Sequence, residues 1–438
     1  MNSLRDGVTP KMKPLSPKRA AVVAGLDVGT SKIACVIGRL KPCAAQDVLP
    51  RRTHSVEVLG IGHTRAAGIK AGHIVNLAEA EQAIRHAVAA AERMAGVRLE
   101  SVVVGVSAGR LSSDLYAATV HASGPAVGDG DIERVLEAGS RHSLRQGRAV
   151  LHSLPIAYAL DDARGIRDPR GMLGGRLGVD MHVVTLEAAA ARNLMLCVER
   201  SHLAVEAMVA TSYVAGLAAL SDDEADLGAA VVDIGAGTTT IAVFAGGHFV
   251  HADGFALGGR HITMDLARGL NIRVADAERV KTLFGSVLAG SSDEHEMITI
   301  AHGDDREAPH AVPRAALSRI VKPRVEEILE MLRDRLAGSP FAATPRGGVV
   351  LTGGGSQLNG LPELATRILN RQVRVGRPLG IAGLPEAAKG AAFAVAAGLL
   401  VYPQTAYLEH FEPRRARPLM TGTDNYITRV GRWLRESF

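Results

Sequence analysis

Two stretches of the chain, some two hundred residues apart, are built alike. The first, VAGLDVGTSKIACVIG, covers Val23–Gly38, and the second, AVVDIGAGTTTIAVF, covers Ala230–Phe244. Each has an apolar run, an Asp-x-Gly turn with small hydroxylated residues, and a second apolar run. This pattern predicts two strands joined by a tight turn. Its repetition predicts that the same hairpin is used twice, in two facing domains.

The turns of both hairpins contain groups that bind phosphate. Successive backbone N–H groups and hydroxyls of such a turn can surround an anion, and Lys32 adds a positive charge. The carboxylates of Asp27 and Asp233 repel phosphate but suit a hydrated Mg²⁺ ion. One Asp-x-Gly turn alone can equally be an ordinary β-turn. The candidate phosphate-binding residues are Gly29, Thr30, Ser31, Lys32, Gly235, Ala236, Gly237, Thr238 and Thr239.

A third glycine-rich element follows both hairpins, in the stretch GGVVLTGGGSQLNGL at Gly347–Leu361. A predicted strand ends there in three glycines, which allow a flat ring to approach the backbone closely. Glu278 and Lys281 lie three apart on a predicted helix and share a face, so they suit either ribose contact or a solvated ion pair. The candidate adenosine-binding residues are Glu278, Lys281, Gly353, Gly354, Gly355 and Ser356.

Composition argues against a nucleic-acid partner. The net charge is only +5 and aromatic residues make up 3% of the chain, whereas RNA-binding modules use aromatic side chains for base stacking. The three cysteines have no metal-ligand spacing, which suits a reducing compartment. No apolar stretch is long enough to cross a bilayer. We therefore expect a cytosolic protein, unless something holds it on a membrane surface.

The last residues of the chain form a separate unit. Pro413–Thr423 is rich in Pro and Arg and has no periodicity, which predicts a linker. The residues after it have apolar side chains on one helical face with arginines beside them, as in helices that lie in a membrane interface. Packing of this helix back onto its own domain is the alternative. The candidate membrane-binding residues are Tyr426, Ile427, Arg429, Val430, Arg432, Trp433, Leu434, Arg435 and Phe438.

The order of hairpin, inserted unit, hairpin, helix and glycine-rich turn resembles that of the actin, Hsp70 and sugar-kinase superfamily. Within it the chain is similar to the FtsA family of bacterial division proteins, through AGLDVGTSKIACVIG, GIKAGHIVNL, VVDIGAGTTTIAVF, AERVKTLFG, VVLTGGGSQLNGL and the terminal WLRESF. The resemblance covers nearly everything from residue 21 to 438. It departs at Ala236, where the family often has glycine.

This resemblance implies an α/β, actin-like fold of two lobes, built from duplicated ribonuclease H-like domains with a relocated small subdomain. The implied division is a disordered tail (1–20), subdomain 1A (21–105 and 187–226), the inserted subdomain 1C (106–186), subdomain 2A (227–258 and 346–402), subdomain 2B (259–345), a linker (403–424) and an amphipathic membrane-targeting helix (425–438).

The resemblance also implies function. Proteins of this family bind ATP with Mg²⁺, polymerise, and lie on the cytoplasmic face of the inner membrane at the division site. There they bind the C-terminal tail of the tubulin-like FtsZ and help to recruit later division proteins. The segment VKPRVEEIL at Val321–Leu329 matches the start of a family helix in the docking subdomain, which makes Arg324 and Glu327 candidates for the FtsZ tail.

Two other functions on the same fold remain open from the sequence. A small-molecule kinase needs a catalytic base near the γ-phosphate and a polar sugar pocket, and no motif indicates either. An Hsp70-type chaperone needs a β-rich substrate domain after residue 402, for which the remaining chain is short. No residue that activates water can be named, so we expect ATP hydrolysis to be slow or negligible.

Overall fold

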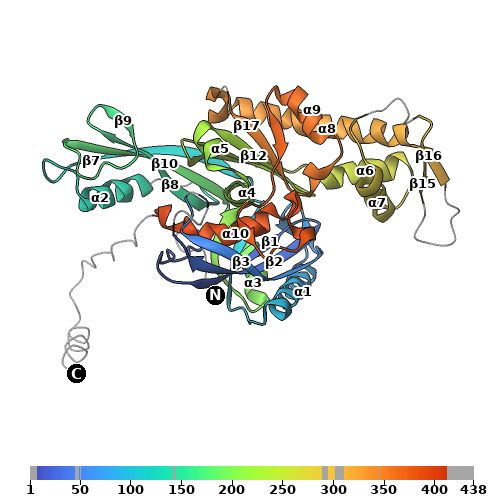
Figure 1. Ribbon diagram of the computed structural model, residues 1–438, viewed down its shortest axis with the longest axis horizontal. Coiled ribbons are helices and arrows are strands. Elements are labelled where there is room, and N and C mark those ends of the chain that lie inside the picture. The colour runs from blue at the N-terminus through green and yellow to red at the C-terminus, as the bar shows by residue number, and fades with distance from the viewer. Residues whose placement is uncertain are drawn as a thin grey trace.

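The structure is a computed structural model that describes residues 7–44, 49, 51–141, 145–288, 294–300, 310–344 and 346–411. Two sheets occupy its centre, a third sheet lies at one end of the long axis, and a group of helices lies at the other end (Figure 1). The predicted α/β class is confirmed.

The first central sheet contains the first of the repeated hairpins. Its strand order is β11 (Ala204–Ala210), β6 (Ser101–Val106), β1 (Ala21–Val28), β2 (Lys32–Pro42), β3 (His54–Arg65) and β19 (Ile381–Ala382). β1, β2 and β3 are antiparallel, whereas β6 and β11 continue the sheet parallel to β1. Helix α1 (Leu77–Ala95) lies close against β3, where a Cβ on Gly62 would be 2.1 Å from the Ala87 carbonyl oxygen.

The second central sheet repeats this plan. Its order is β14 (His248–Phe255), β13 (Thr239–Ala245), β12 (Ala229–Ile234), β17 (Gly348–Thr352) and β18 (Val373–Val375). β12, β13 and β14 are antiparallel, and β17 and β18 continue the sheet parallel to β12. The order therefore matches β3-β2-β1-β6-β11 strand for strand, as the repeated hairpin predicts.

Two helices join the lobes, α4 (Thr211–Ala219) and α10 (Ala394–Val401) (Figure 1). They approach each other closely, because a Cβ on Gly398 would lie 1.9 Å from the Val214 carbonyl oxygen. The sequence predicts a helix at Ala387–Leu400, but the observed α10 is shorter, since short 3₁₀ turns precede it. The sequence also predicts a helix within Leu203–Leu220, which is present as α4, but a strand precedes it, because a short apolar run fits either structure.

The inserted unit forms the third sheet, with the antiparallel order β7 (Ser112–His121), β10 (Arg176–Glu187), β8 (Arg148–Leu160) and β9 (Ala163–Ile166). Helix α2 (Asp129–Ser140) packs on it. The sequence predicts a helix near Ile132–Ser143, three residues later than the observed bounds. The chain returns to the first lobe through α3 (Ala188–Arg200), for which the sequence predicts a helix with the same bounds.

The far end of the second lobe contains α6 (Gly259–Gly269), α7 (Val274–Phe284) and α8 (Arg314–Ala337). α8 continues through Pro323. The stretch Gly285–His310, predicted to be irregular, contains β15 (Met297–Ile300), which pairs with β16 (His310–Pro313). The remaining elements include β4 (Ile69–Lys70), β5 (His73–Ile74), α5 (Asp222–Leu227) and α9 (Leu361–Leu369).

Both ends of the described chain differ from the sequence prediction. Residues 1–20 were expected to be disordered, but Thr9 donates its N–H to the Val150 carbonyl (3.0 Å), and Val150 donates to Gly7 (2.7 Å). β8 offers unpaired backbone groups there, which an extended segment satisfies. The predicted linker at 403–424 also begins later, because residues 403–411 pack on the folded part and Glu409 is almost fully buried.

The predicted membrane helix at 425–438 lies outside the described residues. Within the described ranges, no helix combines the length and the hydropathy that crossing a bilayer requires.

The start of α1 provides a first testable prediction. Asn76 caps this helix, since its side chain accepts a hydrogen bond from the Glu79 N–H at 3.3 Å. Asn76→Ala is expected to lower the free energy of unfolding by about 1 kcal/mol, because the cap satisfies a backbone donor. His86→Ala, an exposed position on the same helix, is the control and should leave stability nearly unchanged. Equal denaturation midpoints for the two variants would contradict the capping role.

Candidate functional site

The turns of the two repeated hairpins have the same construction. Val28 pairs with Ile33 and Ile234 pairs with Thr239, so each turn contains four residues. In the first turn the Gly29 N–H donates to the Lys32 carbonyl at 3.0 Å, and in the second the Gly235 N–H donates to the Thr238 carbonyl at 2.9 Å. The equivalence predicted from the sequence therefore extends to the backbone hydrogen bond.

The two turns meet each other. A Cβ on Gly237 would lie 2.6 Å from the Thr30 hydroxyl oxygen, which accepts a hydrogen bond from the Gly72 N–H at 3.0 Å. Both turns line one cavity of about 480 Å³ between the lobes, within the range of ligand sites in proteins. Of the predicted residues, the cavity is lined by Asp27, Gly29, Thr30, Ser31, Lys32, Asp233, Gly235, Ala236, Thr238, Glu278, Lys281, Gly353, Gly354 and Gly355.

Three predicted residues do not line this cavity. The hydroxyl of Thr239 donates to the Leu257 carbonyl at 2.9 Å, and the buried hydroxyl of Ser356 donates to the Gly353 carbonyl at 2.7 Å. Gly237 is used for contact between the turns. The sequence suggested these residues because each lies next to residues that line the cavity. Successive side chains of a strand point to opposite faces of the sheet, so Thr239 does not share the direction of Thr238. The Ser356 hydroxyl bonds within its own turn.

A carboxylate lies beside each turn, Asp233 buried and Asp27 partly buried. Asp27 and Asp233 each occupy the last position but one of their strands, β1 and β12. Burial and, to a lesser extent, the charge of Asp27 raise the pKa of Asp233 to about 7, although the hydrogen bond from Thr352 and the charge of Lys32 lower it. Burial also raises the pKa of Asp27. A divalent cation would offset both effects, so this donor set fits Mg²⁺.

Lys32 is held on one side of the cavity. Its ammonium donates to the Ala392 carbonyl at 2.7 Å and lies 3.4 Å from the centre of the Phe393 ring. Burial lowers its pKa, while Asp27 and Asp233 raise it. The charge that the sequence assigned to phosphate binding is therefore present at the cavity, fixed by contacts with the segment before α10.

The glycines after β17 bring that strand end against the second hairpin. Gly353 has a φ of +81°, and a Cβ on it would lie 2.5 Å from the Ile234 carbonyl oxygen and 2.7 Å from an Asp233 carboxylate oxygen. A Cβ on Gly354 would meet no atom within 4 Å. The backbone at Gly354 therefore offers the open approach that a flat ring requires.

Glu278 and Lys281 form an ion pair on α7, with 2.7 Å between Nζ and Oε2. Lys281 also donates to the Thr263 hydroxyl (2.9 Å) and the Gly259 carbonyl (3.1 Å), both on α6. Thr263 in turn donates to Glu278. Both charged residues line the cavity, so a role in ribose contact stays a prediction alongside their role in joining α6 and α7.

Comparison with known proteins decides between the functions that this cavity allows. A family model described as "Cell division protein FtsA" matches residues 230–398, and one described as "SHS2 domain inserted in FTSA" matches residues 108–185. A cell division protein FtsA from Rhizobium meliloti (strain 1021) is 54% identical over 431 residues, covering 98% of both chains. The chain belongs to the FtsA family.

Solved structures show the same actin-like fold. The PilM-PilN type IV pilus biogenesis complex contains a chain with a TM-score of 0.59 and 18% identity, over 87% of this chain and 98% of that one. MreB5 of Spiroplasma citri bound to ADP has a TM-score of 0.50 and 15% identity, over 89% of this chain and 98% of that one. Family membership makes this an actin-like cell-division protein and sets aside the kinase and chaperone alternatives.

The SHS2 match at residues 108–185 lies within the predicted insert at 106–186. Other cavity residues were missed by the sequence reasoning. Ser107 and Thr211 directly follow β6 and β11, which run parallel to β1, so they lie at the same sheet edge as the first turn. Ligands of open α/β sheets bind at this edge. The residue that follows each predicted strand could therefore have been named as a candidate cavity residue from the sequence.

The FtsZ-docking candidates of this FtsA-family chain lie outside the cavity, on α8. The segment Val321–Leu329, which resembles the start of a family helix, lies in the middle of α8. Arg324 pairs with Asp265 of α6, with 2.6 Å between Nε and Oδ2, and also contacts Glu327. These hydrogen bonds raise the pKa of Arg324, chiefly the one to Asp265. An acidic partner would have to compete with Asp265.

Proposed function

We propose that this chain binds ATP with Mg²⁺ between its lobes, polymerises, and holds FtsZ at the inner face of the cytoplasmic membrane. One observation carries the nucleotide proposal: two turns of equal construction meet over a single cavity, with a carboxylate beside each. The binding of ADP by the MreB5 relative of the same fold supports it.

The residues divide by chemistry. The two turns would hold the phosphates through backbone N–H groups and hydroxyls. Asp27 and Asp233 would hold Mg²⁺ through water, and the cation would supply positive charge at the phosphate oxygens. The glycines after β17, with Glu278 and Lys281, would hold the adenosine. We assign no residue to activating water and expect slow hydrolysis.

Residues 425–438 would attach the protein to the membrane. Four or five partly buried apolar side chains contribute roughly 5–8 kcal/mol, and each Arg near an anionic surface adds about 1 kcal/mol. Ordering the helix removes a large part of that energy, so a single chain binds at about micromolar affinity or more weakly. A polymer with many tails binds far more tightly through avidity, so polymerisation and membrane attachment are coupled.

Flotation of anionic vesicles in a density gradient tests this coupling. With Mg²⁺ and ATP, the full chain should form filaments and float with the vesicles, and a chain lacking the last fourteen residues should form filaments that do not float. Equal vesicle binding by filaments and by a monomeric variant would contradict the coupling. Absence of filaments under all nucleotide conditions would contradict polymerisation itself.

The FtsZ tail would bind near Arg324, and the inserted subdomain would contact later division proteins. Arg324→Glu should abolish binding of an acidic FtsZ tail peptide, because it reverses the charge that the peptide meets. Asp265→Asn should strengthen binding several-fold, because it releases Arg324 from its partner. Arg319→Glu, on the same helix and exposed, is the control. Unchanged peptide affinity in all three variants would remove this assignment.

A further inference from the structure

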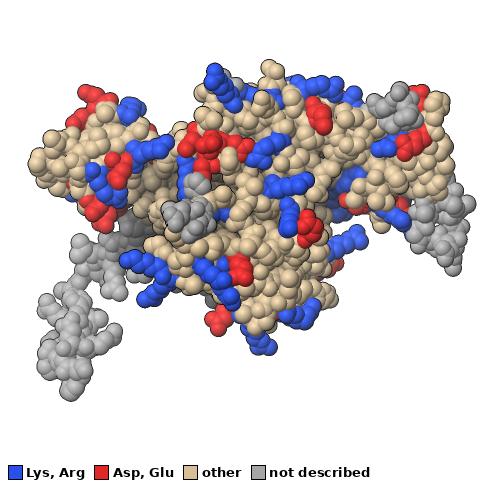
Figure 2. Space-filling model, viewed as in Figure 1, with Lys and Arg blue, Asp and Glu red and all other residues tan. Residues whose placement is uncertain are grey.

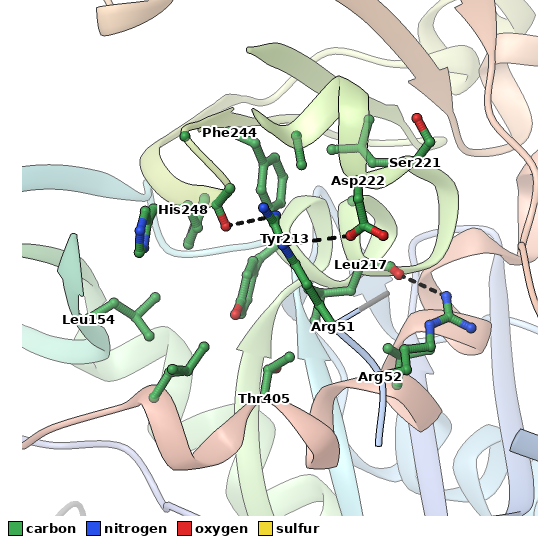
Figure 3. A pocket seen from close by; sticks show the side chains of 18 of the residues that line it. Arg51, Arg52, Leu154, Tyr213, Leu217, Ser221, Asp222, Phe244, His248 and Thr405 are labelled. Carbon is green, nitrogen blue, oxygen red and sulfur yellow. Dashed lines mark hydrogen bonds and ion pairs between the residues drawn. The ribbon is translucent and has the colours of Figure 1, made fainter. Parts of the chain in front are cut away.

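A second cavity, of about 590 Å³, lies away from the nucleotide cavity and shares no lining residue with it. The inserted subdomain, α4 and the second sheet meet there, and Figure 3 shows Leu154, Tyr213 and Phe244 around it. One wall is aromatic: the rings of Tyr213 and Phe249 stack with centroids 4.5 Å apart and an angle of 10°. Such a wall suits another flat apolar ring.

Apolar side chains also surround the mouth of this cavity. Leu379 is 37% exposed, Leu408 is 39% exposed and Tyr407 is 58% exposed, and all three line the cavity. A cavity continuous with exposed apolar side chains is typical of a site that another segment covers.

The chain itself leaves the described part of the structure at this mouth. Tyr407 and Leu408 line the cavity, and the next residues are fixed beside it. The His410 N–H donates to the Ser153 carbonyl at 2.8 Å, directly before Leu154 of the cavity wall, and Glu409 is buried. A flexible chain of thirteen residues spans roughly 20 Å, so residues 412–424 are long enough for the segment that follows to return to the cavity.

We propose that, when no membrane is present, residues 425–438 fold back and insert the side chains of Trp433 and Leu434 into this cavity. This inference rests on the proposed role of the same segment as the membrane anchor. The segment would then have two competing sites, the cavity and the bilayer.

Charged side chains of both signs line this cavity. Acidic side chains gather over α5 (Figure 2), where Asp222 and Asp223 line the cavity. Burial raises the pKa of Asp222 despite Arg51, so a further cation is favourable there, and the terminal segment supplies three arginines. Three arginines also line the cavity. Of these, Arg51 contacts Asp222 and Asp226, and Arg52 donates to the Leu217 and Leu379 carbonyls. Burial lowers the pKa of His248, which also lines the cavity, and the charge of Arg167 contributes to lowering it.

Because the terminal segment is covalently attached to the folded part, weak binding is enough to fill the cavity. A short linker gives an effective concentration of about millimolar, so a contact too weak for a separate peptide still fills the cavity. Many tails on one filament face a membrane together, and the membrane then wins the competition. A single subunit in solution would keep its only tryptophan covered.

Fluorescence of the full chain tests this directly, because Trp433 is the only tryptophan. Without lipid, we expect blue-shifted emission and several-fold protection from acrylamide quenching. Leu408→Arg and Leu434→Arg, one on each side of the contact, should each shift the emission to the red and remove the protection. Leu173→Arg, an exposed position away from the cavity, should leave both unchanged. A red shift in Leu408→Arg could also result from misfolding of the cavity wall. Leu434→Arg does not change the wall, so the same shift in that variant excludes this explanation.

The outcomes separate docking from anchoring. An exposed Trp433 without lipid that shifts to the blue with anionic vesicles would overturn docking and leave the anchor. A covered Trp433 in the parent chain, with no vesicle response even from Leu408→Arg, would support docking and overturn the anchor. Protection that disappears on dilution would show the tail of a second copy in the cavity and overturn docking within one chain. Tighter vesicle binding by Leu408→Arg than by the parent is the result that supports both.

Discussion

Asp233→Asn is expected to make the protein more stable at pH 8 while removing most of its Mg²⁺-dependent affinity for ATP. Burial and the charge of Asp27 raise the pKa of Asp233 from 3.8 to about 7. The folded state therefore binds a proton that the unfolded state releases between about pH 4 and pH 7, and stability falls as pH rises through that range. Because an Asn side chain is not ionised, the substitution removes this loss of folding free energy, which is on the order of 1–4 kcal/mol above pH 7.

The same substitution removes a carboxylate that would hold Mg²⁺ through water, and losing such an outer partner costs about 10–100-fold in affinity. Thermal melts at pH 8 and pH 4 should show a rise of a few degrees only at pH 8, and ATP titrations with and without Mg²⁺ should converge. Asp180→Asn, at an exposed position, is the control. A lower melting temperature at pH 8, with the Mg²⁺ dependence intact, would contradict both roles of Asp233.

Glu409→Ala should cause the largest loss of stability among the substitutions considered. The Glu409 carboxylate contacts Lys11 (2.6 Å), His152 (2.9 Å) and the Tyr402 hydroxyl (2.9 Å). His152 accepts a hydrogen bond from the Ala210 N–H at Nε2 (3.0 Å), so its Nδ1 carries the proton given to Glu409. Removing one member of a buried charged network costs about 3–5 kcal/mol.

Acid titration gives this prediction a second readout. Burial alone would raise the pKa of Glu409, but Lys11 and His152 outweigh it and lower the pKa to about 2. The stability that Glu409 provides is therefore complete above about pH 4.5 and is lost as pH falls toward 2. Glu409→Ala should lack this acid-dependent loss. Glu386→Ala, which removes an exposed pair with Lys389, should change neither the melting temperature nor its pH dependence. Matching melts for the two variants would contradict the importance of the network.

The repeated hairpin could be recognised from sequence because its signal is local. Apolar runs flank a turn that only a few residue types allow, and the structure gives both turns the same length and the same hydrogen bond. α1 and α3 were predictable for a similar reason, since the apolar spacing that predicts each helix lies within one segment, and α1 also has the Asn76 cap.

Features that depend on distant segments were not predictable. Lys11 and Glu409 are polar residues in stretches without periodicity, and they become a largely buried pair only because both stretches contact β8 of the inserted subdomain. The roles of Ser356 and Thr239 were misjudged because side-chain direction, and not adjacency, decides which residues face the cavity. The second cavity has no sequence signal, since its lining comes from several segments far apart.

Calorimetric titration of ATP into the purified full chain tests the central claim most directly. We expect heat that fits one nucleotide per chain in the presence of Mg²⁺, with affinity that falls by about 10–100-fold without Mg²⁺ or in the Asp233→Asn variant. No heat from ATP with Mg²⁺ present, or an affinity unaffected by both changes, would contradict the account that the two turns and their carboxylates form one nucleotide site.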